Sequence, residues 1–309
     1  MRELSPSING LMSLAAVVEH GSFTRAARAL GVSQAAVSQQ VRDLERVCGL
    51  PLVVQHGRLL TTTSLGKELA SIGRSISLES RRAVKSISEH ADGHKGHVTI
   101  GASMTIGVYL VPAILARLQQ TRPGIQVQIE IANTEAIAQA TVDGIVDVGV
   151  VEGSVKRPEL LIAPFAQDEL RCIAPRGHGL RGRPVLLEQL AAETLLLREP
   201  GSGSRETLLD SLAARKFSFA HVVEIGNPEA IFGAVCAGLG ISWASELAVA
   251  AHNTATIEQL QVDDLRVSRT LCYVRRRDLA PSPATLAFLN LLEAGDAYHR
   301  APELATTVR

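Results

Sequence analysis

Two glycines, Gly21 and Gly31, divide the start of the chain into short helical segments. Apolar residues at helical spacing predict a first helix over residues 8–19 and a second over about residues 23–30, each ended by one of these glycines. A third helix follows over about residues 33–48. Two short helices joined by a Gly-Val-Ser turn are typical of a helix-turn-helix, whose second helix can enter a DNA major groove.

The third helix has two contrasting faces. One face is apolar, at spacings of four, three and four residues, and predicts a buried stripe of Val37, Val41, Leu44 and Cys48. The opposite face carries residues that can bond to bases or phosphates, near a helix N-terminus whose free amides also favour phosphate. From spacing alone, a solvated helix face explains this pattern equally well. The residues of this face are Gln34, Ala35, Ser38, Gln39, Arg42 and Arg46.

Hydroxyl side chains stand where the second and third helices begin. Ser22 or Thr24 can cap the second helix, and Ser33 can cap the third. Residues 50–63 then read as short strand-like pieces around Arg58, which predicts a hairpin wing. We therefore interpret residues 1–63 as a winged helix-turn-helix domain.

Ser64 opens a long helix that is predicted to reach residue 91. Its apolar residues follow heptad spacing, lapse at Glu79 and then resume. At a rise of about 1.5 Å per residue the helix is roughly 40 Å long, and its narrow apolar seam needs a partner helix. The simplest partner is a second copy of the chain, and packing on the chain's own second domain is the alternative. The seam consists of Leu65, Leu69, Ile72 and Ile76, and residues 92–96 form a hinge-like linker.

From residue 97 onward, strand patterns alternate with helix patterns. Residues 98–102 read as a strand, residues 106–120 as a helix and residues 125–131 as an alternating strand, and further alternation follows to residue 243. This order predicts an α/β domain with a mostly parallel sheet. Such sheets bind ligands in the loops that follow the carboxyl ends of their strands.

Several of these loops present Ser, Thr, Asn or Gly directly before a helix. Hydroxyls and free amides placed in this way converge on anions, although ordinary helix capping explains some of them. Glu152 is expected at the rim, where it disfavours a multiply charged ligand unless Arg205 offsets it. The candidate ligand-binding residues are Ser103, Met104, Thr105, Asn133, Glu152, Ser202, Gly203, Ser204, Arg205, Asn227 and Pro228.

Composition excludes several classes of protein. A hydrophobic content of 46% excludes intrinsic disorder, and the formal net charge of the whole chain is zero. Residues 1–96 carry 12 Lys and Arg against 8 Asp and Glu, so a mildly basic head, which permits a polyanion partner, precedes a mildly acidic remainder. The start of the chain lacks the pattern of a signal peptide and no apolar run suits a membrane span, so we expect a cytoplasmic protein without a membrane partner.

Metal-binding and catalytic motifs are not found. The 4 cysteines lie far apart and lack histidines at ligand spacing, so neither a metal nor a cofactor is predicted. Residues 177–182 fit a dinucleotide-binding pattern by letter only, because Pro184 prevents a helix from beginning there. Residues 201–204 lack the spacing of a nucleophile elbow. We therefore do not expect an enzyme.

The head resembles the DNA-binding signature of LysR-type transcriptional regulators. The resemblance rests on the segments GSFTRAA (residues 21–27) and VSQAAVS (residues 32–38), together with Leu30 and Leu44-Glu45. Gln39 departs from the arginine that is common there, and LVVQ at residues 52–55 replaces the usual Leu-Phe-x-Arg, so two potential phosphate cations are missing. The DNA-binding residues that the sequence and the resemblance together indicate are Ser22, Thr24, Ser33, Gln34, Ala35, Ser38, Gln39, Arg42 and Arg58.

The resemblance also implies the plan of the whole chain. A two-lobed effector domain like that of periplasmic binding proteins would occupy residues 97–309, with lobe I at about 97–166 and 269–300 and lobe II at about 167–268. The strands that cross between the lobes are expected near residues 164–170 and 267–272. The implied partners are a palindromic double-stranded operator, a small-molecule effector, a second copy in a dimer or tetramer, and the transcription machinery.

Residues 197–205, LREPGSGSR, resemble the LysR subgroup that controls sulfur assimilation, sulfite response and carbon fixation. Ser103, Thr105 and the pair Glu152-Gly153 also suit that subgroup, whose effectors tend to be small anions. A shared structural loop whose ligand differs between branches is the alternative. A solute-binding protein without regulatory DNA binding is the alternative function, but it would need an export signal and no DNA-binding head.

Overall fold

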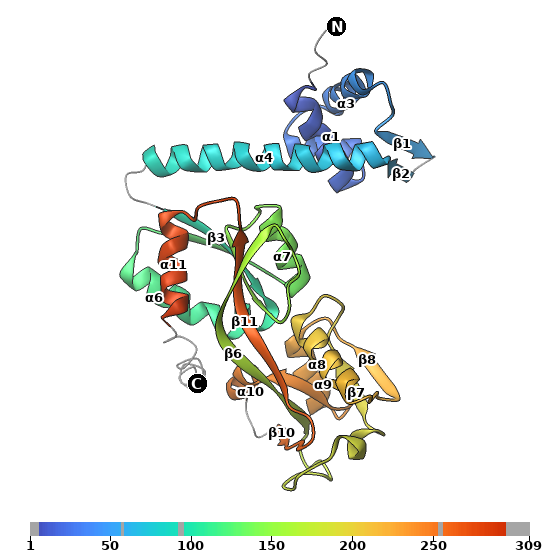
Figure 1. The fold of residues 1–309 in the computed structure, drawn as a ribbon, viewed down its shortest axis with the longest axis vertical. Helices are drawn as coiled ribbons and strands as arrows, with labels where there is room; N and C mark the ends of the chain where they lie inside the picture. Colours follow the sequence, from blue (N-terminus) through green and yellow to red (C-terminus); the bar gives the residue numbers. More distant parts are fainter. Residues whose placement is uncertain (1–5, 57–58, 92–95, 253–255, 295–309) are drawn as a thin grey trace. The chain divides into compact units, whose positions relative to one another are not determined.

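The computed structural model describes residues 6–56, 59–91, 96–252 and 256–294 and divides into two compact units, Met1–Gly93 and His94–Arg309. The predicted hinge falls mostly on residues 92–95, outside the described residues. The first unit contains three short helices, a two-stranded hairpin and one long helix (Figure 1). These elements are α1 (Ile8–His20), α2 (Phe23–Leu30), α3 (Gln34–Cys48), β1 (Val53–His56), β2 (Leu59–Thr62) and α4 (Ser64–Ala91).

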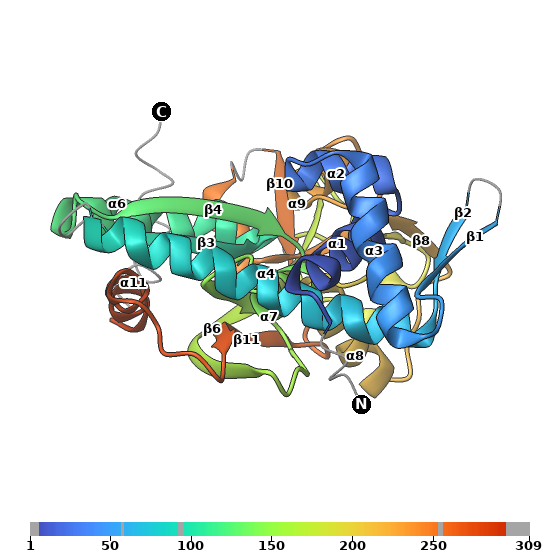
Figure 2. The same cartoon turned by 90° about the horizontal axis from the view of Figure 1, so that it is seen from above.

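The helix ends of the first unit follow from their capping residues. Gly21 and Gly31 end α1 and α2 at φ values of 59° and 68°, a left-handed conformation that costs glycine little. The hydroxyls of Ser22 and Ser33 accept hydrogen bonds from the first turns of α2 and α3. The turn between α2 and α3 is therefore bounded by a glycine cap at the end of α2 and a serine cap at the start of α3. The β1–β2 hairpin lies beside α3 (Figure 2).

Helix α4 packs along the core of its own unit. Leu65, Leu69 and Ile76 contact a core that includes Leu14 and Val41. Gly66 and Gly73 of α4 lie so close to the backbone of neighbouring elements that a Cβ atom would not fit at either position. Part of the surface of these three residues therefore packs on the core of their own unit, to which α1 contributes, and the predicted pairing with a second copy stays a prediction. Heptad spacing indicates that a helix packs against another surface, but it does not identify that surface.

The apolar residues that α4 leaves exposed lie elsewhere. Ile72, the fourth predicted seam residue, is 45% exposed. Further along the helix, Val84 is 66% and Ile87 is 68% exposed. These three side chains are the apolar residues of α4 that the described part of the chain leaves most exposed.

The second unit is built on a mixed sheet of seven strands in the order β10-β6-β11-β5-β3-β4, with β9 also paired to β6. Only β3, β4 and β5 run parallel, so the expectation of a mostly parallel sheet is wrong for the rest. The strands are β3 (His97–Ser103), β4 (Gln126–Ala132), β5 (Val148–Glu152), β6 (Leu160–Pro175), β7 (Thr194–Leu197), β8 (His221–Glu224), β9 (Ser242–Ser245), β10 (Ile257–Leu260) and β11 (Val267–Arg276). The separate pair β7–β8 is parallel.

Helices cover this sheet on the way between strands. One predicted helix over residues 106–120 is two helices in the structure, because Pro112 in the first turn of the second one donates no backbone hydrogen bond. The helices are α5 (Met104–Tyr109), α6 (Val111–Thr121), α7 (Thr134–Val142), η1 (Leu187–Leu190), α8 (Gly203–Ala214), α9 (Pro228–Cys236), α10 (Glu246–Ala251) and α11 (Pro283–Glu293).

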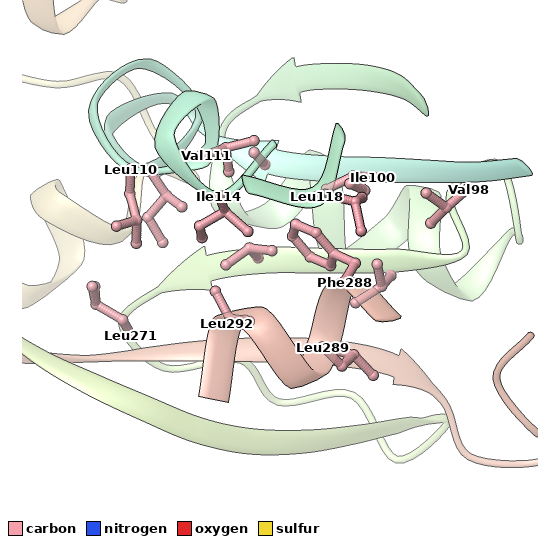
Figure 3. Close-up of a cluster of buried hydrophobic side chains, with 14 of the residues drawn as sticks. Val98, Ile100, Leu110, Val111, Ile114, Leu118, Leu271, Phe288, Leu289 and Leu292 are labelled. Atoms are coloured by element: carbon pink, nitrogen blue, oxygen red, sulfur yellow. The ribbon is translucent and has the colours of Figure 1, made fainter. Parts of the chain in front are cut away.

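Strands β6 and β11 join two lobes of the second unit. They pair antiparallel from Val267 opposite Leu170 to Arg276 opposite Leu160, and they pass through the predicted crossing segments. The first lobe has its core between α6, α11 and β3, where Phe288 lies among Ile114, Leu118 and Ile100 (Figure 3). The second lobe has a separate core around β7, β9 and α8 that includes Leu195 and Trp243.

Gly73 allows α4 and α1 to approach closely, since a Cβ there would lie 2.1 Å from the backbone oxygen of Leu11. We expect Gly73→Ala to lower the free energy of unfolding of the first unit by about 1–3 kcal/mol, because backbone cannot move aside as a flexible side chain would. Urea denaturation of residues 6–91, followed by circular dichroism, measures this change. Ser71→Ala, on the exposed side of the same helix, is the control, and equal stability of both variants would contradict the close packing.

Candidate functional sites

The predicted DNA-facing residues of α3 lie on one surface of the first unit. Gln34, Ala35, Gln39 and Arg42 are exposed and Ser38 is half-buried, whereas the stripe of Val37, Val41 and Leu44 is buried. The residue spacing alone left open whether this face was simply solvated. The structure shows that it is an exposed helix face, free of other described elements of its own unit.

Side chains on this face are linked by hydrogen bonds. Arg42 Nη2 donates to Gln39 Oε1 at 3.0 Å, and Gln39 Nε2 donates to Asp43 Oδ1 at 2.9 Å. Arg46 forms an ion pair with Asp43 at 2.9 Å, and Gln34 Nε2 lies 3.5 Å from Ser38 Oγ. Asp43 was not among the predicted residues, and its spacing of four from Gln39 was the available signal.

The remaining predicted DNA-binding residues have local roles in the structure. The hydroxyls of Ser22 and Ser33 accept from the backbone N–H groups of Arg25 and Ala36, at 3.5 and 3.1 Å. Thr24 is exposed in the first turn of α2. Arg58 lies outside the described residues, between the strands of the hairpin.

The second unit gathers buried polar side chains where its two lobes meet. We call this set the interlobe cluster. Ser103 ends β3, Thr105 lies in α5, and Glu152 ends β5, all in the first lobe. The second lobe contributes residues that lie just before and within the first turn of α8, and the crossing strand β11 contributes Arg269. The cluster comprises Ser103, Thr105, Glu152, Ser202, Ser204 and Arg269, all buried.

The hydrogen bonds of the predicted ligand-binding side chains show which of them are ordinary helix caps. Asn133 and Asn227 accept from the first-turn N–H groups of α7 and α9, so helix capping accounts for their presence. Ser103 and Ser202 stand at the same position before α5 and α8, yet neither side chain caps its helix. Ser103 Oγ instead donates to the carboxylate of Glu152. The capping explanation therefore fails for the two serines.

Arg269 connects the charged groups of the cluster. Its Nε donates to Asp168 Oδ2 at 2.8 Å and its Nη1 donates to Ser204 Oγ at 2.7 Å, while Nη1 lies 3.4 Å from Glu152 Oε1. Ser245 Oγ donates a hydrogen bond to Asp168 Oδ1 at 3.0 Å. Sequence reasoning missed Arg269 and Asp168 as site residues, because each lies inside a strand and outside any motif.

Glu152 is buried, with 1% of its surface exposed, so its predicted place at the rim of the site is wrong. Burial raises the pKa of its carboxyl, and the positive charges of Arg269 and Arg198 reduce this rise without cancelling it. Arg205 does not offset Glu152, because its Nη1 donates to the backbone oxygen of Arg198 at 2.6 Å and to Glu224 at 3.1 Å. The compensating cation is Arg269.

One hydroxyl of the cluster has no partner among the described residues. Ser202 Oγ is buried without a hydrogen bond, and Arg269 Nη2, although close to Asp168, lacks an acceptor in good hydrogen-bond geometry. Buried polar groups are nearly always hydrogen-bonded, so an orphaned pair of this kind needs an explanation. A bound polar molecule would provide one.

The other predicted ligand residues fall into two groups. Gly203 belongs beside the cluster, since a Cβ there would lie 2.1 Å from the backbone oxygen of Glu152. Asn133 Nδ2 also reaches across the lobes, to the backbone oxygen of Pro200 at 3.3 Å. Met104 begins α5, and Pro228 and Asn227 begin α9, where no bond to the cluster is found within the described residues.

In the part of the chain that the structure describes, no group of His, Cys, Asp and Glu side chains is arranged to hold a metal ion. None of the described helices is long and apolar enough to cross a membrane.

Two family models match the chain. The model for the bacterial regulatory helix-turn-helix protein of the lysR family matches residues 8–67, and the model for the LysR substrate binding domain matches residues 91–297. The chain is 35% identical to the uncharacterized HTH-type transcriptional regulator YeiE of Escherichia coli K12 over 92% of this chain and 96% of that protein. It is 33% identical to the RuBisCO operon transcriptional regulator of Allochromatium vinosum, over 91% and 94%.

A solved structure resembles the second unit. The regulatory domain of CcmR from Synechocystis PCC6803, in complex with 2-PG, matches with a TM-score of 0.60 and 26% identity. The match covers 64% of this chain and 96% of the CcmR chain.

The raised pKa of Glu152 predicts a pH-dependent stability of the second unit. The folded state holds the proton above the ordinary pKa of 4.5, so the free energy of unfolding should fall as the pH rises above that value. Glu152→Gln keeps a carbonyl acceptor and removes the charge, so the variant should be more stable than the native protein at neutral pH and similar below about pH 4. Urea denaturation at both pH values measures this difference.

The matched control is Glu159→Gln, because Glu159 is exposed. A stability difference for Glu152→Gln that is the same at both pH values would show that the charge of Glu152 is not responsible.

Proposed function

Because the chain belongs to the lysR family of bacterial regulatory helix-turn-helix proteins, it is a DNA-binding transcriptional regulator, and we propose that a small anion controls it. The effector would bind at the interlobe cluster. The observation that carries this proposal is the Ser202 hydroxyl, which is buried without a hydrogen-bond partner among the described residues and belongs to a buried polar cluster.

The donors of the cluster suit a small anion. Hydroxyls from both lobes and the guanidinium of Arg269 can all donate hydrogen bonds, and hydrogen bonds to a charged acceptor are the stronger kind. Glu152 is the one group that opposes an anion, and its raised pKa weakens that opposition by favouring the neutral form. Since the cluster is small and holds one cationic residue, a compact inorganic or carboxylate anion is favoured over a sugar bisphosphate.

Contacts between the lobes support a closure mechanism. The backbone N–H of Glu135 donates to the oxygen of Gly201 at 3.1 Å, and Tyr109 of α5 donates to Glu229 of α9. A ligand that touches both lobes favours the lobe angle that it fits. We propose that this change of angle reaches the DNA-binding heads through residues 92–96 and α4.

We further propose that two or more copies assemble on a palindromic operator, with the transcription machinery as a further partner. The exposed Ile72, Val84 and Ile87 of α4 supply an apolar surface for this association. The division that we propose is residues 1–63 for DNA binding, 64–91 for assembly, 92–96 for the hinge and 97–309 for effector binding.

The alternatives are weaker. A solute-binding protein without regulatory DNA binding would not need a DNA-binding head, whereas the head of this chain matches the lysR helix-turn-helix model. The family is one of transcriptional regulators, and we infer that the chain acts in the cytoplasm on operator DNA and not as an enzyme.

Gln39 tests the DNA-binding face. We expect Gln39→Ala to lose about 1–3 kcal/mol of operator affinity with little change in the stability of the first unit, because the side chain is exposed and reads bases. Footprinting and anisotropy titration with an operator measure the affinity. Val41→Asp should instead unfold the head, since Val41 is buried, and equal operator affinity for Gln39→Ala and the native protein would rule out this assignment.

Calorimetry tests the effector site. Sulfite, sulfate, phosphate and small carboxylates are titrated separately into the full chain, and we expect one of them to bind. Ser103→Ala and Ser202→Ala should each weaken that binding by about tenfold, the value of one hydrogen bond to a charged group. Ser268→Ala, on the exposed side of β11, is the control. If both cluster variants bind the anion as tightly as the native protein, the site lies elsewhere, and binding of only an uncharged ligand would exclude an anion.

A further inference from the structure

The exposed face of α3 holds one glutamine between two charged side chains of opposite sign. Gln39 accepts a hydrogen bond from Arg42 Nη2 at 3.0 Å through its Oε1, and it donates one to Asp43 Oδ1 at 2.9 Å through its Nε2. Arg46 pairs with the same carboxylate oxygen at 2.9 Å. The amide of Gln39 is therefore held on both sides.

These neighbours fix which way the amide faces. A guanidinium can only donate hydrogen bonds, and a carboxylate can only accept them. Turning the amide over would place its N–H groups against Arg42 and its oxygen against Asp43, so both hydrogen bonds would be lost. Asp43 is the partner that holds the nitrogen end.

A fixed amide reads one base better than the others. Gln39 Oε1 keeps a second lone pair and Nε2 keeps a second N–H, so the side chain still offers one acceptor and one donor. Adenine presents the complementary N6 donor and N7 acceptor in the major groove. Guanine presents two acceptors there, N7 and O6, and one of them would face the fixed oxygen of Gln39.

We propose that Asp43 is a positioning residue that sets base specificity, by holding Gln39 in the orientation that reads adenine. The proposal rests on the DNA-binding role of the head and adds a residue and a base to it. Asp43 also carries a negative charge on a helix that approaches phosphates, so it lowers affinity for DNA of any sequence. A residue that only stabilised the fold would not change base preference and affinity for unrelated DNA in this way.

The test measures base preference and general affinity separately. The full chain selects sites from a randomised duplex library, and sequencing gives the half-site. Fluorescence anisotropy then gives the affinity for the best site and for duplexes with each base at the position that responds to Gln39→Arg. Arginine pairs with guanine, so this variant should move the preference at one position from adenine to guanine and thereby identify it.

We expect the native protein to prefer adenine over guanine there by at least about fivefold. Asp43→Ala should reduce this preference to less than about twofold, with equal or higher affinity for unrelated DNA. Asp43→Asn keeps a neutral acceptor at the same place, so it should retain the preference. Glu19→Ala, which removes an exposed acidic side chain from α1, should leave the preference unchanged and controls for charge alone.

Three results would overturn the proposal. One is a native half-site without a preference for adenine at the position that Gln39→Arg identifies, which would leave DNA binding by the head intact. Another is an Asp43→Ala protein that keeps the native preference. The third is an Asp43→Ala protein that loses affinity equally for all four bases, which would indicate damage to the helix.

Discussion

The guanidinium of Arg269 is the interaction on which the second unit depends most. It is buried on a strand that crosses between the lobes, and it bonds Asp168 on the neighbouring crossing strand and Ser204 at the start of α8. Because a buried arginine without a carboxylate would be strongly unfavourable, Asp168, whose carboxylate bonds this guanidinium, is needed for stability as well as for shape. The same guanidinium contacts Ser204 and Glu152 of the interlobe cluster, so one residue both links the crossing strands and positions the candidate site.

Local sequence signals predicted the head and the order of elements well. Glycine stops and serine caps placed α2 and α3 to within about a residue, because these effects act over a single turn. The family resemblance is confirmed by both family models, and its carbon-fixation branch by the RuBisCO operon regulator among the relatives. Ser103 and Ser202 were predicted from their positions in loops that follow strands, and both are buried in the interlobe cluster, while their binding of a ligand stays a prediction.

The failures share a physical reason, which is that they concern contacts between residues distant in the sequence. The seam of α4 indicated that a partner was needed, but heptad spacing could not show that three of its residues also pack on the core of their own unit. Glu152 was placed at a rim because acidic side chains are rarely buried unless paired, and its partner Arg269 lies 117 positions further along the chain. The crossing segments near residues 164–170 and 267–272 were predicted, but the antiparallel direction of their pairing was not, for the same reason.

The crossing strands β6 and β11 also constrain how the lobes can move. They are hydrogen-bonded neighbours along their whole paired length, from Val267 opposite Leu170 to Arg276 opposite Leu160, with one irregularity between Leu271 and Cys272. Two paired strands bend and twist elastically, whereas a single flexible linker swings freely. The change of lobe angle that we propose would have to bend or twist this paired ribbon, so the ribbon would favour a return to the original angle once the ligand leaves.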